Sequence, residues 1–212
     1  CNRAPKLDLT SDNLLNFGII CVPAAVIGAR LYYVAFNWDM YSGDLLKILN
    51  IRLGGLAIHG GLIFGLGAAA ILCVIWKIRP LNAMDLAAPC IAIAQSIGRW
   101  GNYFNSEAHG GPTDLPWGVE INGMTYHPTF LYESIWCFML FFFLIYVDNR
   151  RKFEGQTILL YGILYSVERF FVEGLRTDSL MIGPFRQAQL LSLTVIIICT
   201  AFYLILRKQM SR

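Results

Sequence analysis

Long apolar stretches alternate with short polar ones along the chain, and six of the apolar stretches are long enough to cross a bilayer. A bilayer core about 30 Å thick needs about 20 apolar residues in a helix that rises about 1.5 Å per residue. The six stretches fall at about 14–36, 56–76, 84–104, 128–147, 156–172 and 188–206. The pattern predicts an all-α, polytopic helical membrane protein with six transmembrane helices, folded as a single domain over residues 1–212.

The composition supports a membrane location and excludes several classes. Hydrophobic residues make up 56% of the 212 residues and charged residues 15%, against about 45–50% and about 25% in soluble globular proteins. The net charge is +3 and the basic residues are dispersed, so nothing points to nucleic acid as a partner. The six cysteines form no CxxC pair and lie mostly in apolar runs, which is typical of small buried residues. We predict neither a bound metal nor a cofactor.

The basic residues predict which end of each helix faces the cytoplasm, because Lys and Arg collect in cytoplasmic loops. One side of the predicted bundle carries ten of them and the other side four, alternating correctly through six crossings. The ten are Arg3, Lys6, Lys77, Arg79, Arg150, Arg151, Lys152, Arg207, Lys208 and Arg212, and the four are Lys47, Arg52, Arg176 and Arg186. We therefore predict a multi-pass protein of the cytoplasmic membrane with both chain ends in the cytoplasm.

The loops on the predicted outer side differ from the short basic loops on the inner side. The segments at about 37–55 and 105–127 are long and rich in glycine and aromatic residues. Long loops among compact elements are usually functional. The three histidines, His59, His109 and His127, also fall on or beside the outer side. We therefore expect the active site toward the extracytoplasmic face.

Charged residues inside the predicted helices point to one layer of the membrane. An ionisable side chain in a membrane helix costs about 2.5–3.5 kcal/mol and marks a functional site by default. Arg99 lies ~22 Å of helix rise from the inner end of its span, and Arg169 lies ~20 Å from the inner end of its own. Glu133 and His59 reach the same level from the outer ends of two other spans. Four polar groups therefore meet at the height of the outer-leaflet headgroups.

Two interpretations of these arginines are open. In the first, Arg169 pairs with Glu173, which makes the burial of both charges in the membrane tolerable. Arg99 then only extends its charged end to the outer membrane–water interface. In the second, the two arginines bind a phosphate, which planar guanidiniums grip through paired hydrogen bonds. Gln95, Arg99 and Asn102 form one polar stripe at i, i+4 and i+7. The matched depth and this polar support favour the second interpretation, with a phospholipid headgroup as the anion.

His59 and the glycines that follow it also allow two interpretations. Gly61 and Gly65 have a spacing that usually means close helix packing. Gly60 and Gly61 also remove side chains beside His59, and an imidazole can accept a proton near neutral pH. His59 can equally be an ordinary interfacial histidine. The other two histidines have plainer explanations, as a loop residue and as a helix cap.

Five blocks of this sequence resemble the bacterial prolipoprotein diacylglyceryl transferase family. GRWGNYFNSEAHGG (98–111) matches every fixed position of the family signature except that Tyr103 replaces the usual Phe. Further blocks match in the family's order: GARLYYVAFNW (28–38), HGG (59–61), HPTFLYE (127–133) and RFFVEGLRTDSL (169–180). The family usually has seven membrane helices, and this chain begins just after the place of the first. The resemblance therefore implies six spans in this chain.

The resemblance implies a transferase that needs no cofactor. It would move the sn-1,2-diacylglyceryl group of phosphatidylglycerol to the lipobox cysteine thiol of a prolipoprotein and release glycerol phosphate. By position, Arg99 and Arg169 correspond to essential arginines near the lipid phosphate, and His59 to the histidine discussed as a base. Other sensitive or acidic positions of the family blocks correspond to Asn102, Glu107, Gly110, Glu133 and Glu173.

The expected active site combines two overlapping sets of residues. The expected catalytic residues are His59, Arg99, Glu107, Arg169 and Glu173, and the expected substrate-binding residues are Arg99, Asn102, Gly110, Glu133, Arg169, Gly60 and Gly61. His59 is the first candidate for accepting the thiol proton, and Glu107 or Glu173 the second. The competing classes are a membrane transporter and a membrane enzyme that acts on other lipid-linked phosphates. A transporter predicts polar residues through the whole helix depth, whereas the inner halves hold little beyond Asp85 and Thr157.

Overall fold

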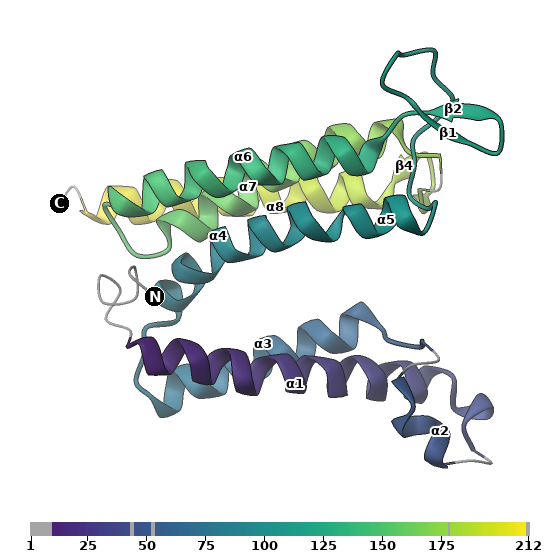
Figure 1. Cartoon of the computed structure of the whole chain (residues 1–212). Helices are drawn as coiled ribbons and strands as arrows, with labels where there is room; N and C mark the ends of the chain where they lie inside the picture. The colour runs from purple at the N-terminus through teal and green to yellow at the C-terminus, as the bar shows by residue number, and fades with distance from the viewer. Residues whose placement is uncertain (1–9, 43–44, 52–53, 178, 211–212) are drawn as a thin grey trace. The chain divides into compact units, whose positions relative to one another are not determined.

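A computed structural model describes residues 10–42, 45–51, 54–177 and 179–210 (Figure 1). The long helices in the described chain are α1 (Ser11–Phe36), α3 (Ile58–Ile75), α4 (Pro80–Gly98), α6 (Thr129–Asn149), α7 (Gln156–Leu175) and α8 (Gln187–Met210). The shorter ones are the 3-10 helix η2 (Trp38–Met40), α2 (Leu45–Leu49) and α5 (Trp100–Phe104). Two small antiparallel hairpins pair β1 (Val119–Ile121) with β2 (Met124–Tyr126) and β3 (Met181–Ile182) with β4 (Phe185–Arg186). The predicted helical class is confirmed, with these hairpins as additions.

Each predicted apolar stretch contains one long helix, but within the described residues four helices have the length and apolarity of a membrane span. These four are α1, α3, α6 and α8. The helices α4 and α7 are less apolar because they carry polar and charged residues, among them Asp85 and Glu168. In addition, α4 ends at Gly98 and Arg99 separates it from α5, so the stretch predicted as one span over 84–104 is interrupted. The six-span topology stays a prediction.

The chain divides into two compact units, residues 1–83 and 84–212, and its organisation as a single domain stays a prediction. In the first unit, α1 packs closely along α3. Gly60 is buried, and a Cβ atom there would lie 2.3 Å from the carbonyl oxygen of Gly28. A Cβ atom on Gly28 would in turn lie 2.3 Å from the Cβ of Phe64. Close helix packing is therefore a sufficient reason for glycine at both positions.

Arg30 organises the connection between α1 and α3 within the first unit. Arg30 is 5% exposed, and its guanidinium lies 5.0 Å from the ring centre of Tyr41. The guanidinium donates hydrogen bonds of 2.6–3.1 Å to five backbone carbonyls, those of Lys47, Ile48, Asn50, Gly54 and Gly55. A guanidinium has five N–H donors, so this burial is well compensated. The described part of the predicted outer segment 37–55 is therefore built around one arginine.

The second unit is held together by an apolar core and by a pair of serines. Ala88 and Ala92 of α4 pack with Leu140 and Leu144 of α6. Near the other end of the same helices, the hydroxyls of Ser96 and Ser134 each donate to the other residue's carbonyl at 2.8 Å. Small and hydroxyl-bearing residues allow membrane helices to approach closely and to exchange hydrogen bonds. The serine pair therefore fixes α4 against α6 next to Arg99.

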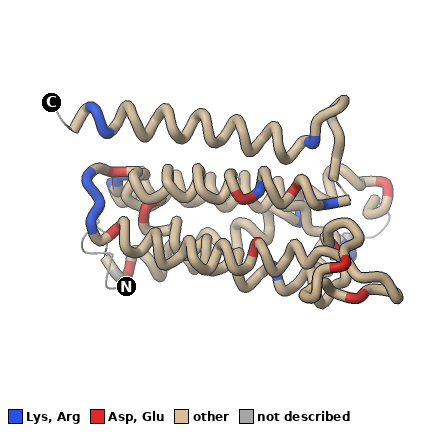
Figure 2. Tube along the Cα trace, turned by 90° about the horizontal axis from the view of Figure 1, so that it is seen from above, with Lys and Arg blue, Asp and Glu red and all other residues tan. Residues whose placement is uncertain are grey.

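The two ends of the second unit differ in charge. Basic residues gather at the end of α8 where Arg207 and Lys208 lie, together with the loop between α6 and α7, residues 150–152 (Figure 2). The opposite end carries α5 and the hairpins (Figure 1). The arrangement agrees with the loop charges used above, of which Arg3, Lys6, Arg52 and Arg212 lie outside the described residues. Which end faces the cytoplasm stays a prediction.

Candidate active site

Arg99 occupies the break between α4 and α5 and reaches a carboxylate on α6. Its Nη2 atom lies 2.6 Å from Oε2 of Glu133, which forms an ion pair. The same nitrogen donates a hydrogen bond of 3.1 Å to the hydroxyl of Tyr165 on α7. From this position between α4 and α5, one cation contacts both neighbouring helices.

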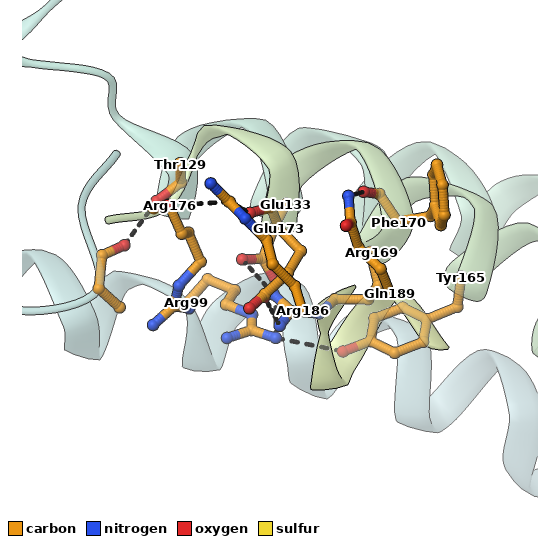
Figure 3. Close-up of polar contacts among 11 residues, drawn as sticks. Arg99, Thr129, Glu133, Tyr165, Arg169, Phe170, Glu173, Arg176, Arg186 and Gln189 are labelled. Atoms are coloured by element: carbon orange, nitrogen blue, oxygen red, sulfur yellow. Dashed lines mark hydrogen bonds and ion pairs between the residues drawn. The ribbon is translucent and has the colours of Figure 1, made fainter. Parts of the chain in front are cut away.

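Arg169 of α7 approaches the same carboxylate from the other side. Its Nη1 atom lies 2.9 Å from Oε1 of Glu133, and its Nη2 atom lies 2.9 Å from Oε2 of Glu173. Glu173 is one turn further along α7, at the i+4 position that lets helical side chains meet. Two arginines from separate helices therefore converge on Glu133, one at each of its oxygens (Figure 3).

The carboxylates of this cluster are more deeply buried than the guanidiniums. The side chains of Glu133 and Glu173 are 1% and 6% exposed, whereas those of Arg99 and Arg169 are 22% and 17% exposed. Removing the carboxylate partner from a buried ion pair leaves an uncompensated charge, so the negative side chains hold the cations in place. The accessible part of the cluster is thus positively charged, and it can bind an anion through planar, bidentate donors.

A third arginine closes the end of α7 beside the cluster. The Nη1 atom of Arg186 donates to the backbone carbonyls of Glu173 and Arg176, the second at 2.9 Å (Figure 3). These carbonyls are among those that a helix leaves without partners at its C-terminus, where a cation is also favoured. Arg186 therefore stabilises the turn that carries Glu173.

The signature segment that follows Arg99 is tied to both neighbouring helices by backbone hydrogen bonds. The N–H of Gly110 donates to the carbonyl of His127 before α6, and that of Gly111 donates to the carbonyl of Leu175 at the end of α7, both at 2.9 Å. A Cβ atom on Gly110 would lie 2.6 Å from Cβ of His127. Close packing of the backbone is therefore sufficient to require glycine at position 110. A contact between Gly110 and the substrate would be an additional role.

A cavity of about 290 Å³ lies among the signature segment, β1 and the start of α6. Its polar lining comes from Asn102, Ser106, Glu107, His109, Glu120 and His127, and its apolar lining from Tyr103, Phe104, Val119, Ile121, Pro128 and Phe130. Glu107 accepts a hydrogen bond of 3.1 Å from the side-chain amide of Asn105. Ser106 and Ala108 have φ angles of 53° and 55°, a left-handed conformation that is uncommon without glycine. The surrounding contacts therefore hold this segment in a bent shape around the cavity.

The predicted site residues fall in both compact units, and those of the second unit are brought together there. Arg99, Glu133, Arg169 and Glu173 form one connected cluster, and Asn102 and Glu107 line the cavity. His59, Gly60 and Gly61 belong to the first unit. There the imidazole of His59 is exposed and stacks on Tyr32, with ring centres 6.1 Å apart.

Two residues that shape the cluster, Tyr165 and Arg186, are not among the site residues expected from the sequence. Tyr165 lies four residues before Arg169 on the same helical face, so the i, i+4 spacing could have identified it. Arg186 could not be found in this way, because its contacts are with backbone carbonyls across a hairpin. Among the described residues, no group of three His, Cys, Asp or Glu side chains could hold a metal ion.

The fold and the site define a class of helical membrane protein in which one buried carboxylate joins two partly exposed arginines. A family model described as prolipoprotein diacylglyceryl transferase matches residues 1–205. A phosphatidylglycerol–prolipoprotein diacylglyceryl transferase of Clostridioides difficile (strain 630) is 51% identical over 195 residues, which is 92% of this chain and 79% of that protein. The enzymes of the same name from Finegoldia magna and Clostridium botulinum (strain Langeland) are both 49% identical. The matched regions cover 92% and 93% of this chain and 79% and 82% of the two relatives, respectively. The chain belongs to the prolipoprotein diacylglyceryl transferase family.

Proposed function

We propose that this protein transfers the sn-1,2-diacylglyceryl group of phosphatidylglycerol to the cysteine thiol of a prolipoprotein lipobox and releases glycerol phosphate. The family, whose relatives carry this activity in their names, supports both the reaction and the location in a bacterial cell membrane. The observation that carries the site assignment is the convergence of Arg99 and Arg169 on one carboxylate, Glu133. The basic inner loops support an active site on the extracytoplasmic side.

Arg99 and Arg169 would bind the lipid phosphate. The contacts described for Arg99 all use Nη2, and those of Arg169 use Nη1 and Nη2, so other N–H groups on both guanidiniums can reach an anion. Glu133 keeps the two cations at one point while the site is empty of lipid. Asn102 follows Arg99 by three residues and lines the cavity, and we assign it to substrate binding.

The chemical step is a substitution at the glycerol C3 carbon. The sulfur forms a C–S bond as the C–O bond to phosphate breaks, and the leaving phosphate takes the electron pair. The thiolate is the reactive form of cysteine, so the thiol proton passes to an acceptor and finally to the released phosphate. Arg99 and Arg169 stabilise the charge that collects on the leaving group, an effect commonly worth about 3–4 kcal/mol per donor.

His59 is our first candidate for the proton acceptor, and the surroundings of the two glutamates favour one of them as the second candidate. Glu173 is buried and its carboxylate already pairs with Arg169 inside the cluster. Glu107 lines the cavity and accepts one hydrogen bond from a neutral amide, so it is better placed to receive a proton. We therefore rank Glu107 above Glu173.

The test compares Arg99→Ala with His59→Ala in proteoliposomes that contain labelled phosphatidylglycerol and a lipobox peptide. Losing an arginine should lower transfer by about 10²–10³-fold, more than losing a base that other groups can partly replace. Mass spectrometry should show the peptide gaining one diacylglyceryl unit. An unmodified peptide with altered lipid would instead indicate an enzyme of other lipid phosphates, and wild-type turnover in Arg99→Ala would overturn the phosphate assignment.

A further inference from the structure

Glu168 of α7 is a buried carboxyl group without a hydrogen-bond partner. The residue is 6% exposed, and neither side-chain oxygen accepts or donates a hydrogen bond within the described part of the chain. It directly precedes Arg169, yet Arg169 pairs with Glu133 and Glu173 instead. Glu168 takes no part in the reaction steps proposed above.

Charged groups surround Glu168 without neutralising it. The ones that act on it most strongly are Glu133 of α6, then Arg169 of α7 and Arg99 between α4 and α5. Cys137, one turn beyond Glu133 on α6, is also within electrostatic reach. The ionisable residues of α8 are Cys199, Tyr203, Arg207 and Lys208, all in its second half. Of these, Cys199 packs against Gly162, almost two turns of α7 away from Glu168.

The charge of the cluster is already balanced without Glu168. Two arginine cations and the two carboxylates paired with them, those of Glu133 and Glu173, sum to +2 − 2 = 0. An ionised Glu168 would be a third negative charge, buried and without a donor, which is a costly arrangement in a protein interior. A carboxyl group in that position keeps its proton rather than its charge.

We propose that Glu168 is a neutral, protonated carboxylic acid that acts as a positioning residue for the phosphate of the lipid substrate. The proposal rests on the proposed function, because it assumes that an anionic phosphate comes to Arg99 and Arg169. Protonated Glu168 leaves the cluster neutral, so the phosphate meets two cations without a surplus of negative charge.

The test is the pH dependence of KM for phosphatidylglycerol in wild type and in Glu168→Gln, which is neutral at every pH. A unit charge about 8 Å from a bound anion changes its affinity roughly thirtyfold at an effective dielectric of about 20. Between roughly pH 6 and 9, the range in which buried carboxyl groups titrate, wild-type KM should rise by about that factor as Glu168 ionises. The KM of Glu168→Gln should stay flat, and its kcat at neutral pH should stay within about threefold of wild type.

Two kinetic outcomes would overturn the proposal. Identical pH profiles of KM in the two proteins would mean that Glu168 does not change charge near the phosphate. A hundredfold loss of kcat in folded Glu168→Gln would mean that its proton is transferred in the reaction. Asp114→Asn is the matched control, because it removes an exposed carboxylate of the outer loop and should leave the wild-type profile intact.

Infrared spectroscopy tests the protonation directly and does not depend on turnover. The carbonyl band of a protonated carboxyl group should be present in the wild type, absent from Glu168→Gln and shifted in Glu168→Asp. A spectrum without that band would overturn the proposal, and Glu168→Asp serves if the glutamine variant does not fold. A wild type that shows the band but never transfers diacylglyceryl groups would instead contradict the proposed function.

Discussion

The two ends of the second unit each bury a carboxylate that faces an arginine, but they supply its partners differently. At the basic end, Asp85 is fully buried and accepts hydrogen bonds from Arg151 at 3.0 Å and from the backbone N–H groups of Gly155 and Ile158 at 2.8 and 2.9 Å. At the other end, the two oxygens of Glu133 each face an arginine side chain from a different helix.

Because of this difference, the contacts of Asp85 are structural, whereas those of Glu133 can be exchanged for contacts with another anion. The backbone donors to Asp85 belong to the first turn of α7, so they cannot leave the carboxylate unless that turn unwinds. The donors to Glu133 are long side chains with rotatable bonds, and a second anion can draw them away. The contacts at the basic end should therefore determine the stability of the protein, and the arginine cluster should determine its activity. The two ends contain similar residue types.

The largest expected effect comes from Glu133→Gln. The amide removes the charge between Arg99 and Arg169 and turns an NH₂ group toward one of them. One arginine then faces a donor and the other keeps only an uncharged acceptor, and a hydrogen bond to a charged group is worth about 1.5–3 kcal/mol, so the cations should be misplaced and transfer should fall by about a hundredfold. Labelled-lipid transfer measures the loss, and the apparent melting temperature in detergent should change much less.

Glu133→Asp is the control for this prediction, because it keeps the charge and shortens the side chain by one methylene. It should retain more transfer than the glutamine variant. If Glu133→Gln transferred at the wild-type rate, Glu133 would not be needed to hold the arginines, and activity would not depend on this exchangeable contact.

Residue counting along the chain predicts the level of the arginine cluster but not its internal contacts. The rise per residue places Arg99, Arg169 and Glu133 at one depth, and the structure joins these three side chains. Which carboxylate bridges the arginines depends on how each helix is rotated about its axis, and hydropathy carries no such information. The five carbonyls around Arg30 are hidden for a similar reason, because loop carbonyls have no sequence signature.

The helix boundary at Arg99 and the contacts of Asp85 are two further features that cannot be predicted from the order of residues. The stretch 84–104 is apolar enough to suggest one span, yet α4 ends at Gly98 and α5 begins at Trp100. The sequence shows Asp85 only as one of two polar residues in the inner halves, with Thr157, whereas the donors Arg151, Gly155 and Ile158 come from a segment about 70 residues away. Long-range pairing of this kind follows from packing, which the order of residues does not reveal.

Asp85→Asn should have the next largest effect, and it should act on stability. The amide keeps one acceptor but faces Arg151 or a backbone N–H with a donor. Breaking a buried pair of this kind costs about 3 kcal/mol. Thermal unfolding in nanodiscs should show a clear loss, while KM for phosphatidylglycerol in the surviving folded protein stays near the wild-type value. A large rise in KM at unchanged stability would mean that the two ends of the unit are functionally coupled.

Thr157→Val should give the smallest effect of the series. The Thr157 hydroxyl donates to Oδ1 of Asp148 at 3.1 Å, and both residues are buried at the same end as Asp85. Valine has nearly the same shape but no donor, so the variant should lose about 1 kcal/mol and about 2–4 °C in apparent melting temperature. Thr157→Ser keeps the hydroxyl and should lose less. Because this contact lies among the fixed partners of the basic end, transfer at neutral pH should match wild type. A tenfold loss of transfer in Thr157→Val without a change in melting temperature would place part of the catalytic machinery at the basic end and remove the distinction between the two.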